Sequence, residues 1–340
     1  MFLIFVSALV FAIGGTPIVR KLAPMLGIID HPSARKVHTK PVPLLGGVAI
    51  YVAFVAALLL FGAQFYVEQL IGIFVGATWV SFLGIWDDWR GLRPILKLIG
   101  QAIGAAILIG TGVQTEFLHN PWLNIGITIF WVVGITNALN LLDNMDGLSS
   151  GVTAVAAGWF ALLSLSNGQV LVGAMSLALL GAALGFWIYN FNPASIFMGD
   201  TGSLFLGFLL AAVGIKLRFL GHPDEVTWMI PVLVLGVPVF DTTLVVISRL
   251  RRGLNPLTTP GRDHLSHRLV RMGLSPRRAV VAIYGVGMLL GLIAFMIQNM
   301  IQPIAYAIFA AILLIGILAL VRLEQAPFAT PNPANGNEAK

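Results

Sequence analysis

Long apolar stretches recur along almost the whole of this sequence. A helix needs about 20 mostly apolar residues to cross the hydrocarbon core of a bilayer. We therefore predict an all-α polytopic membrane protein of about 11 transmembrane helices. The candidate spans are residues 1–19, 44–62, 70–86, 95–112, 122–139, 148–165, 169–188, 203–219, 228–248, 279–298 and 301–321.

The composition excludes an ordinary soluble protein. Of the 340 residues, 58% are hydrophobic and only 10% are charged, whereas roughly 25% are charged in soluble domains. The absence of cysteine excludes disulfides, thiolate nucleophiles and zinc–thiolate sites. A net charge of +6 would suggest nucleic acid binding in a soluble protein. Its distribution instead indicates membrane orientation, so we expect no nucleic acid partner.

The basic residues favour one orientation, because Lys and Arg accumulate in cytoplasmic loops. With the N-terminus outside, only Lys216 and Arg218 of the 20 basic residues fall on the external side. The C-terminus is then cytoplasmic. We expect a single transmembrane domain over 1–324 and a disordered cytoplasmic tail over 325–340. The aspartates predicted on the cytoplasmic side are Asp30, Asp87, Asp88, Asp143, Asp146, Asp200, Asp241 and Asp263.

Three acidic segments lie at the predicted cytoplasmic edge, where acids in apolar stretches are functional candidates. Asp87 and Asp88 end the third stretch; they are either solvated, or hold a cation, or divide two roles, since neighbours on a helix point in different directions. In the second acidic segment, Asn140, Asp143 and Asp146 recur every three residues and, if helical, share one face. A polar helix end capped by glycine is the simpler alternative.

The third acidic segment runs from Asn190 to Ser203 and contains Asp200 between two glycines. Asp200 could cap a helix, the turn could offer backbone N–H groups to an anion, or the carboxylate could coordinate a hard cation. Oxygen ligands without cysteine favour Mg²⁺, with Mn²⁺ as the alternative, over zinc. Because Mg²⁺ takes one or two carboxylates, some of these acids should bind substrate instead.

The longest cytoplasmic segment, residues 249–278, is rich in arginine. Topology and attraction to anionic lipid account for most of this charge, but not for the run that begins at Gly261. Imidazole and guanidinium groups suit a diphosphate. The candidate diphosphate contacts are Arg262, His264, His267 and Arg268.

Together these groups indicate phosphoryl transfer at a membrane surface, from a soluble nucleotide to a lipid. From about Arg35 to Met272, the motifs resemble those of the polyprenyl-phosphate N-acetylhexosamine-1-phosphate transferases. The resemblance makes the transmembrane domain one catalytic domain and implies the following roles. Catalytic residues are Asp87 and Asp88, metal ligands are Asp200 and Asp87, and substrate-binding residues are Lys97, Asn140, Asp143, Asp146, Asn192, Phe197, Arg262, His264, His267 and Arg268.

The resemblance implies transfer of a HexNAc-1-phosphate from a UDP-sugar to polyprenyl (undecaprenyl) phosphate, with release of UMP. GlcNAc is the default sugar. The reaction would be the first membrane step of cell-envelope glycan synthesis, on the cytoplasmic face of the inner or plasma membrane, and a homodimer is a candidate assembly. Ser266 replaces the middle histidine of the family's His-x-His-His motif.

Three alternatives remain open. A phospho-MurNAc-pentapeptide transferase would carry a consecutive histidine run, which this sequence lacks. An ion or phosphate transporter would place charges near the bilayer midplane. A non-catalytic lipid-binding scaffold would explain the basic loops but not the acidic pair.

Overall fold

The computed structural model describes residues 1–30, 41–61, 67–219, 227–259 and 261–325, whose regular secondary structure is helical apart from one short pair of strands. That pair, β1 (Ile29–Asp30) and β2 (Val42–Pro43), is antiparallel. The long helices are α1 (Phe2–Met25), α2 (Gly46–Phe61), α3 (Val67–Arg90), α4 (Pro94–Gly110), α5 (Pro121–Leu142), α6 (Leu148–Ser166), α7 (Val170–Asn190), α8 (Gly199–Lys216), α11 (Gly236–Arg251), α13 (Pro276–Ile297) and α14 (Gln302–Glu324). The short helices are α10 (Met229–Val234) and α12 (Leu265–Arg271).

The prediction of an all-helical, multi-pass membrane protein is confirmed. Within the described ranges, eight helices are long and apolar enough to cross a membrane, and α2 and α4 are apolar but shorter. The ninth predicted span, 228–248, is wrong as one continuous helix, because it is divided into α10 and α11 at Leu235. Pro238 explains the break, since it has no N–H to donate to the carbonyl of Val234.

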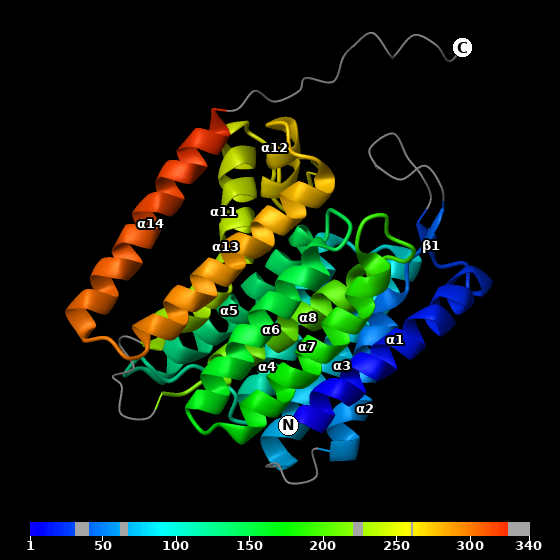
Figure 1. The fold of residues 1–340 in the computed structure, drawn as a ribbon, viewed down its shortest axis with the longest axis horizontal. Coiled ribbons are helices and arrows are strands. Elements are labelled where there is room, and N and C mark those ends of the chain that lie inside the picture. The colour runs from blue at the N-terminus through cyan, green and yellow to red at the C-terminus, as the bar shows by residue number, and fades with distance from the viewer. Residues whose placement is uncertain (31–40, 62–66, 220–226, 260, 326–340) are drawn as a thin grey trace.

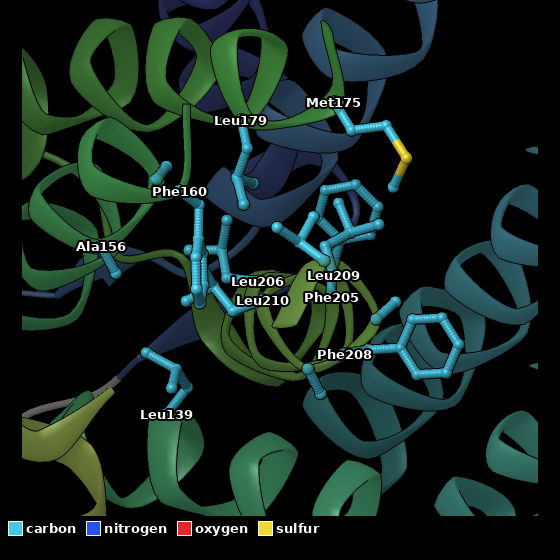
Figure 2. Packing of buried hydrophobic residues seen from close by; sticks show 14 of the residues in the cluster. Leu139, Ala156, Phe160, Met175, Leu179, Phe205, Leu206, Phe208, Leu209 and Leu210 are labelled. Carbon is cyan, nitrogen blue, oxygen red and sulfur yellow. The ribbon is translucent and has the colours of Figure 1, made fainter. Parts of the chain in front are cut away.

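Helix α8 lies at the centre of the bundle and packs against α2, α3, α5, α6 and α7. Its apolar side chains project in all directions, among them Phe205, Leu206 and Phe208 (Figure 2). A helix that is apolar all round is a buried helix. Its glycines also allow close approach, because a Cβ on Gly207 would lie 2.7 Å from the Cα of Thr136 in α5.

The ends of the helices place the predicted site. Helices α3 and α5 end, and α8 begins, with polar residues of the acidic segments, and Lys97 lies in the first turn of α4. Figure 1 shows α12, β1 and the end of α14 at one end of the bundle, with the N-terminus at the other. The predicted tail from residue 326 onward, and the basic residues Arg35, Lys36 and Lys40, lie outside the described residues.

Candidate active site

The acidic pair at the end of α3 faces two different partners, as expected of neighbours on one helix. Asp88 accepts hydrogen bonds from the backbone N–H groups of Asp200 at 2.8 Å and Thr201 at 3.0 Å, and from the Thr201 hydroxyl at 2.7 Å. The Asp88 carboxylate thus offsets the positive end of the α8 dipole. It also accepts hydrogen bonds from two backbone N–H groups that have no partner within the helix. The N–H groups that the sequence suggested for a substrate anion are therefore occupied by Asp88.

Two glycines let α3 approach the start of α8 this closely. A Cβ on Gly84 would lie 2.5 Å from the backbone oxygen of Asp200. Gly199 has a φ of 68°, in the left-handed region that favours glycine. A Cβ on Gly199 would also lie 2.5 Å from Oδ2 of Asp88. Both positions require glycine if Asp88 is to contact the first turn of α8.

Lys97, in the first turns of α4, connects the acidic pair to α8. Its ammonium nitrogen lies 3.0 Å from Oδ2 of Asp87 and also donates to Oδ2 of Asp200. Asp87 accepts a further hydrogen bond from the backbone N–H of Leu92 at 2.5 Å. Because the connection between α3 and α4 is short, Lys97 of α4 lies beside Asp87 at the end of α3.

Asn140, in the last turn of α5, holds Asp200 from another side. Its amide donates to Oδ1 of Asp200 at 2.9 Å and to the hydroxyl of Ser203 at 2.9 Å. Asp200 is thus oriented by α4 and α5 at once. Ser203 and Thr201 were not among the predicted site residues, although polar positions in the first turn of an apolar helix are the signal that would have identified them.

The second acidic segment is helical only at its start, because α5 ends at Leu142, so the condition under which Asn140, Asp143 and Asp146 would share one helical face is not met. Asp143 follows as the C-terminal cap, and its carboxylate has no hydrogen-bond partner within the described part of the chain. Burial, reinforced by the charges of Asp200, Asp88 and Asp146, raises the pKa of Asp143 to about 8. A cation or a ligand's hydrogen-bond donors would stabilise its ionised form.

Asp146 turns toward the loop that precedes α8. Its Oδ2 accepts hydrogen bonds from the amide of Asn192 and the backbone N–H of Ala194, both at 3.0 Å. Nε of Arg277, in α13, donates to the backbone oxygen of Asn192 at 2.8 Å. Asp146 and Asn192, both predicted substrate contacts, therefore also join this loop to the end of α5 and to α13.

Phe197 lies in the same loop, just before α8. Its backbone N–H donates to the carbonyl of Pro43 at 2.9 Å, and its carbonyl accepts from the N–H of Gly46 at 2.9 Å. These bonds fix the chain beside β2 and α2, three residues before Asp200. The ring is half-buried.

A buried ion pair joins the end of α11 to the residues just before α12. Arg249 binds both oxygens of Asp263 at 3.0 Å, and Arg252 lies 2.6 Å from one of them. Burial alone would raise the pKa of Asp263, but the hydrogen bonds and charge of Arg249 and Arg252 outweigh it and lower the pKa to about 2. The carboxylate is therefore ionised at neutral pH and holds the segment together.

Arg268 has a structural role that the sequence did not predict. Its side chain is buried and donates to the backbone oxygens of Asp263 at 2.8 Å and Leu323 at 2.6 Å, and to Ser248 and Glu324 at 2.9 and 2.6 Å. In this structure the guanidinium group joins α11, α12 and α14, so it is not accessible to a diphosphate. The predicted diphosphate contact at Arg268 is corrected on this ground, whereas Arg262 is exposed.

His264 and His267 lie at the start of α12, with ring centroids 6.2 Å apart. Nδ1 of His264 is 2.8 Å from Oδ2 of Asp241, and Oδ1 of Asp241 accepts the backbone N–H of Leu265 at 2.6 Å. Burial, followed by repulsion from His264 and Arg262, lowers the pKa of His267 to about 4, so His267 is neutral at neutral pH. Asp241 was not a predicted site residue, although an acid inside an apolar stretch would have pointed to it.

Ser266 links α12 to the second acidic segment. Its hydroxyl donates to the side-chain oxygen of Asn144 at 2.6 Å, and Ser266 is buried. Asn144 directly follows Asp143, so the first turn of α12 lies beside that segment. The residue that replaces the family's middle histidine thus makes a specific contact.

The aspartate cluster, which we define as Asp87, Asp88, Asp143 and Asp200, suits a hard cation in its donor chemistry. Its ligand atoms are carboxylate oxygens, and two of the carboxylates already bind a cation, the ammonium group of Lys97. Among the described residues, no three acidic or histidine side chains form a ready-made metal site.

An apolar cavity of about 560 Å³ lies between α5, α8, α10 and α11. Its lining includes Gly134 and Ala138 of α5 and Thr242 of α11. These helices also carry Asn140 and Asp241, so the cavity lies along the same helices as the polar site. Glu116 and Arg218 line another part of it.

Known proteins resemble this chain over most of its length. A "Probable undecaprenyl-phosphate N-acetylglucosaminyl 1-phosphate transferase" of Bacillus subtilis (strain 168) is 39% identical over 308 residues, which is 87% of this chain and 84% of the relative. A "Decaprenyl-phosphate N-acetylglucosaminephosphotransferase" of Mycolicibacterium smegmatis is 34% identical, covering 86% and 80%. A "Phospho-N-acetylmuramoyl-pentapeptide-transferase" of Bacillus cytotoxicus is 32% identical, covering 83% and 91%.

The model of glycosyl transferase family 4 matches residues 70–218, the range from α3 to α8. Fold and site define a multi-pass membrane protein with an acidic, lysine-bridged site at one end of its helices. Together with the similarity to whole relatives, they confirm the resemblance found in the sequence: the chain belongs to the polyprenyl-phosphate N-acetylhexosamine-1-phosphate transferase family.

Proposed function

We propose that the protein transfers a HexNAc-1-phosphate, with GlcNAc as the default sugar, from a UDP-sugar to polyprenyl phosphate. The names of its relatives support the lipid acceptor and the sugar. The observation that carries the proposal is the convergence of Asp87, Asp88, Lys97 and Asp200 from three helices. It joins carboxylates and a fixed cation at one membrane edge, which is the chemistry that phosphate groups require.

In the proposed reaction, an oxygen of the lipid phosphate attacks the phosphorus that carries the sugar. A new diphosphate bond forms, the bond to UMP breaks, and UMP leaves with the electron pair of that bond. The lipid phosphate is already anionic at neutral pH, so a strong general base is not required. The protein's main tasks are to position two anions in line and to balance their charge.

Asp200 and Asp87 are the proposed ligands for Mg²⁺, with Mn²⁺ as the alternative. When bound, the ion would neutralise charge that develops on the phosphate oxygens. Lys97 keeps a positive charge between these carboxylates, and Asn140 fixes the orientation of Asp200. Asp88 acts through the first turn of α8, because it holds the backbone of Asp200 in place.

The donor would lie between the aspartate cluster and α12. Asp143 has a carboxylate available to it, and the Ser266–Asn144 hydrogen bond keeps α12 beside Asp143. We assign nucleotide-sugar contacts to Asp143, Asp146, Asn192 and Phe197, and diphosphate contacts to Arg262, His264 and His267.

The apolar cavity is the proposed site for the polyprenyl chain. Its lining is mainly apolar, it lies within the membrane-spanning helices, and it follows α5 toward Asn140. An isoprenoid chain gains favourable free energy when it leaves water for such a surface. A lipid seated there would direct its phosphate toward the end of α5, where the aspartate cluster lies.

The positive-inside distribution supports eleven spans with the N-terminus outside, the C-terminus cytoplasmic and the site on the cytoplasmic face of the plasma membrane. We further propose that residues 1–324 form one catalytic domain. A homodimer stays a candidate assembly.

The decisive experiment uses the full-length protein in nanodiscs with undecaprenyl phosphate, Mg²⁺ and a panel of UDP-sugars that includes UDP-GlcNAc and UDP-MurNAc-pentapeptide. UMP release and the lipid-linked product are recorded together. We expect UDP-GlcNAc to yield both in equal amounts. Product from the pentapeptide donor alone would identify the protein as a phospho-MurNAc-pentapeptide transferase instead. If no donor yielded product, the proposal would be overturned.

A further inference from the structure

Asp241 is a carboxylate inside the apolar helix α11, and it is fully buried. Both of its oxygens are used: Oδ2 lies 2.8 Å from Nδ1 of His264, and Oδ1 accepts the backbone N–H of Leu265 at 2.6 Å. His264 is itself only 4% exposed. A buried carboxylate is costly unless it is paired and hydrogen-bonded, so this contact determines how His264 can sit.

The contact also determines which ring nitrogen of His264 remains available. An ionised carboxylate only accepts hydrogen bonds, so Nδ1 must carry the hydrogen. Nε2 is then the nitrogen left for another partner. A carboxylate behind a functional histidine commonly fixes its tautomer and ring orientation in this way.

The surroundings place this histidine beside the proposed donor site. Ser266, two residues further on, is hydrogen-bonded to Asn144 at 2.6 Å, directly after Asp143. Two neighbouring groups of the same segment, Asp263 and His267, also interact electrostatically with His264. His264 is therefore the histidine of the pair that has a buried counter-charge behind it.

We propose that Asp241 is a positioning residue that holds the Nδ1–H of His264 and presents Nε2 to a phosphate oxygen of the bound diphosphate. When Nε2 is protonated and donates to that oxygen, the Asp241 carboxylate balances the imidazolium charge. This inference rests on the proposed function, and it assigns to a buried acid of α11 an effect on donor binding that acts through α12.

A purely structural role for Asp241 is the competing explanation. Its bond to the N–H of Leu265 caps the start of α12, and loss of that cap would destabilise the helix whatever residue stood at 264. Positioning through His264 makes the opposite prediction, because Asp241 would then have nothing to position once the imidazole is removed.

A double-mutant cycle in the full-length protein separates these roles. Asp241→Asn, His264→Ala and the double variant are compared in the UMP-release assay, with kcat and KM for the UDP-sugar measured separately. We expect Asp241→Asn alone to lower kcat/KM about tenfold, the lower end of what loss of a histidine's supporting partner costs. In the His264→Ala background, we expect a change of less than about twofold, since coupled residues are not additive.

Asp263→Asn is the matched control, because Asp263 is a buried acid of the same segment that pairs with Arg249 instead of a histidine. Its effect should persist in the His264→Ala background, because the Arg249 ion pair that it breaks does not involve the imidazole. If Asp241→Asn lowers kcat/KM by the same factor with and without His264→Ala, Asp241 only supports the fold and the inference is overturned.

A second measurement does not depend on turnover. ¹⁵N NMR of histidine-labelled protein, assigned with His264→Ala, reports which nitrogen of His264 carries the hydrogen. We expect Nδ1–H in the wild type and a changed signal in Asp241→Asn. A wild-type His264 with hydrogen on Nε2 alone would overturn the inference. If the wild type released no UMP from any UDP-sugar, the proposed function would fail, while the NMR result would still decide the positioning claim.

Discussion

The carboxylate of Asp88 lies 2.8 Å from the backbone nitrogen of Asp200, although 112 positions separate the two residues in the chain. The contact places one acid of α3 under the first turn of α8 and leaves the neighbouring Asp87 to meet Lys97. Asp88 therefore holds the first turn of α8 in place, whereas Asp87 lines the site.

We predict that Asp88→Asn lowers kcat by about a hundredfold with little change in KM for the UDP-sugar. The amide keeps the size of the side chain but loses the charge and one acceptor, so the Asp200 backbone shifts, and small displacements of reacting groups carry penalties of this order. Thr201→Val is the control, because it removes only the hydroxyl bond to Asp88. It should cost about 1 kcal/mol of stability and leave most activity; equal losses in both variants would argue against the charge as the important feature.

Gly199→Ala should inactivate the protein and lower its melting temperature. The methyl group would meet Oδ2 of Asp88 at 2.5 Å, and the φ of 68° is strained for alanine, which together cost about 1–3 kcal/mol. Gly316→Ala in α14 is the matched control, since a Cβ there meets nothing within 4 Å. Thermal unfolding in detergent compares the two, and an active Gly199→Ala variant would show that Asp88 can move without consequence.

Chelation of divalent ions should abolish turnover, and Mg²⁺ or Mn²⁺ should restore it. Binding to the folded state alone raises stability, so Mg²⁺ should also raise the melting temperature of the wild type. Asp200→Asn should remove both effects while the protein still inserts, because Asp200 is the carboxylate that α4 and α5 orient together. An equal Mg²⁺-induced shift in Asp200→Asn would exclude Asp200 as a ligand.

Much of the fold could be predicted from the sequence, because the length of an apolar stretch is a local and strong signal in membrane proteins. The acidic segments were also identifiable, since carboxylates at the ends of apolar stretches are rare and costly. The sequence analysis did not identify the residues at which two of the helices are interrupted or end. Pro238 divides the ninth span, and α5 ends at Leu142, so the regular spacing after Asn140 does not correspond to one helical face.

The interaction partner of each polar side chain could not be predicted from the sequence, because it depends on how distant segments of the chain pack. Arg268 has the composition of a phosphate ligand, but its position between α11 and α14 makes it a buried structural cation. Asp88 resembles a free acid until Gly84 and Gly199 bring α8 against it. Asp241 acquires its histidine only when α12 folds back onto α11.

His267 should make the protein less stable in mildly acidic solution. Its pKa falls from about 6.5 in the unfolded chain to about 4 in the folded protein. Between these pH values the unfolded state binds more protons than the folded state. The contribution of His267 to stability is therefore full above about pH 6.5 and is lost as the pH falls toward 4, by about 3 kcal/mol in total. Melting temperatures at about pH 7 and pH 5 test this. His267→Gln should reduce the acid-induced loss, and an unchanged loss would assign it to other groups.

Gly134→Phe should weaken binding of long polyprenyl phosphates specifically. Gly134 lines the apolar cavity, and a Cβ there meets nothing within 4 Å, so a side chain at this position can begin without a clash beside the space proposed for the lipid. KM for undecaprenyl phosphate should rise about tenfold, whereas KM for the UDP-sugar should stay constant. Gly126→Phe is the matched control: it lies on the same helix with equal space but outside the cavity lining, and it should leave both constants unchanged. Equal KM values for undecaprenyl phosphate in the wild type and Gly134→Phe would place the lipid elsewhere on the protein.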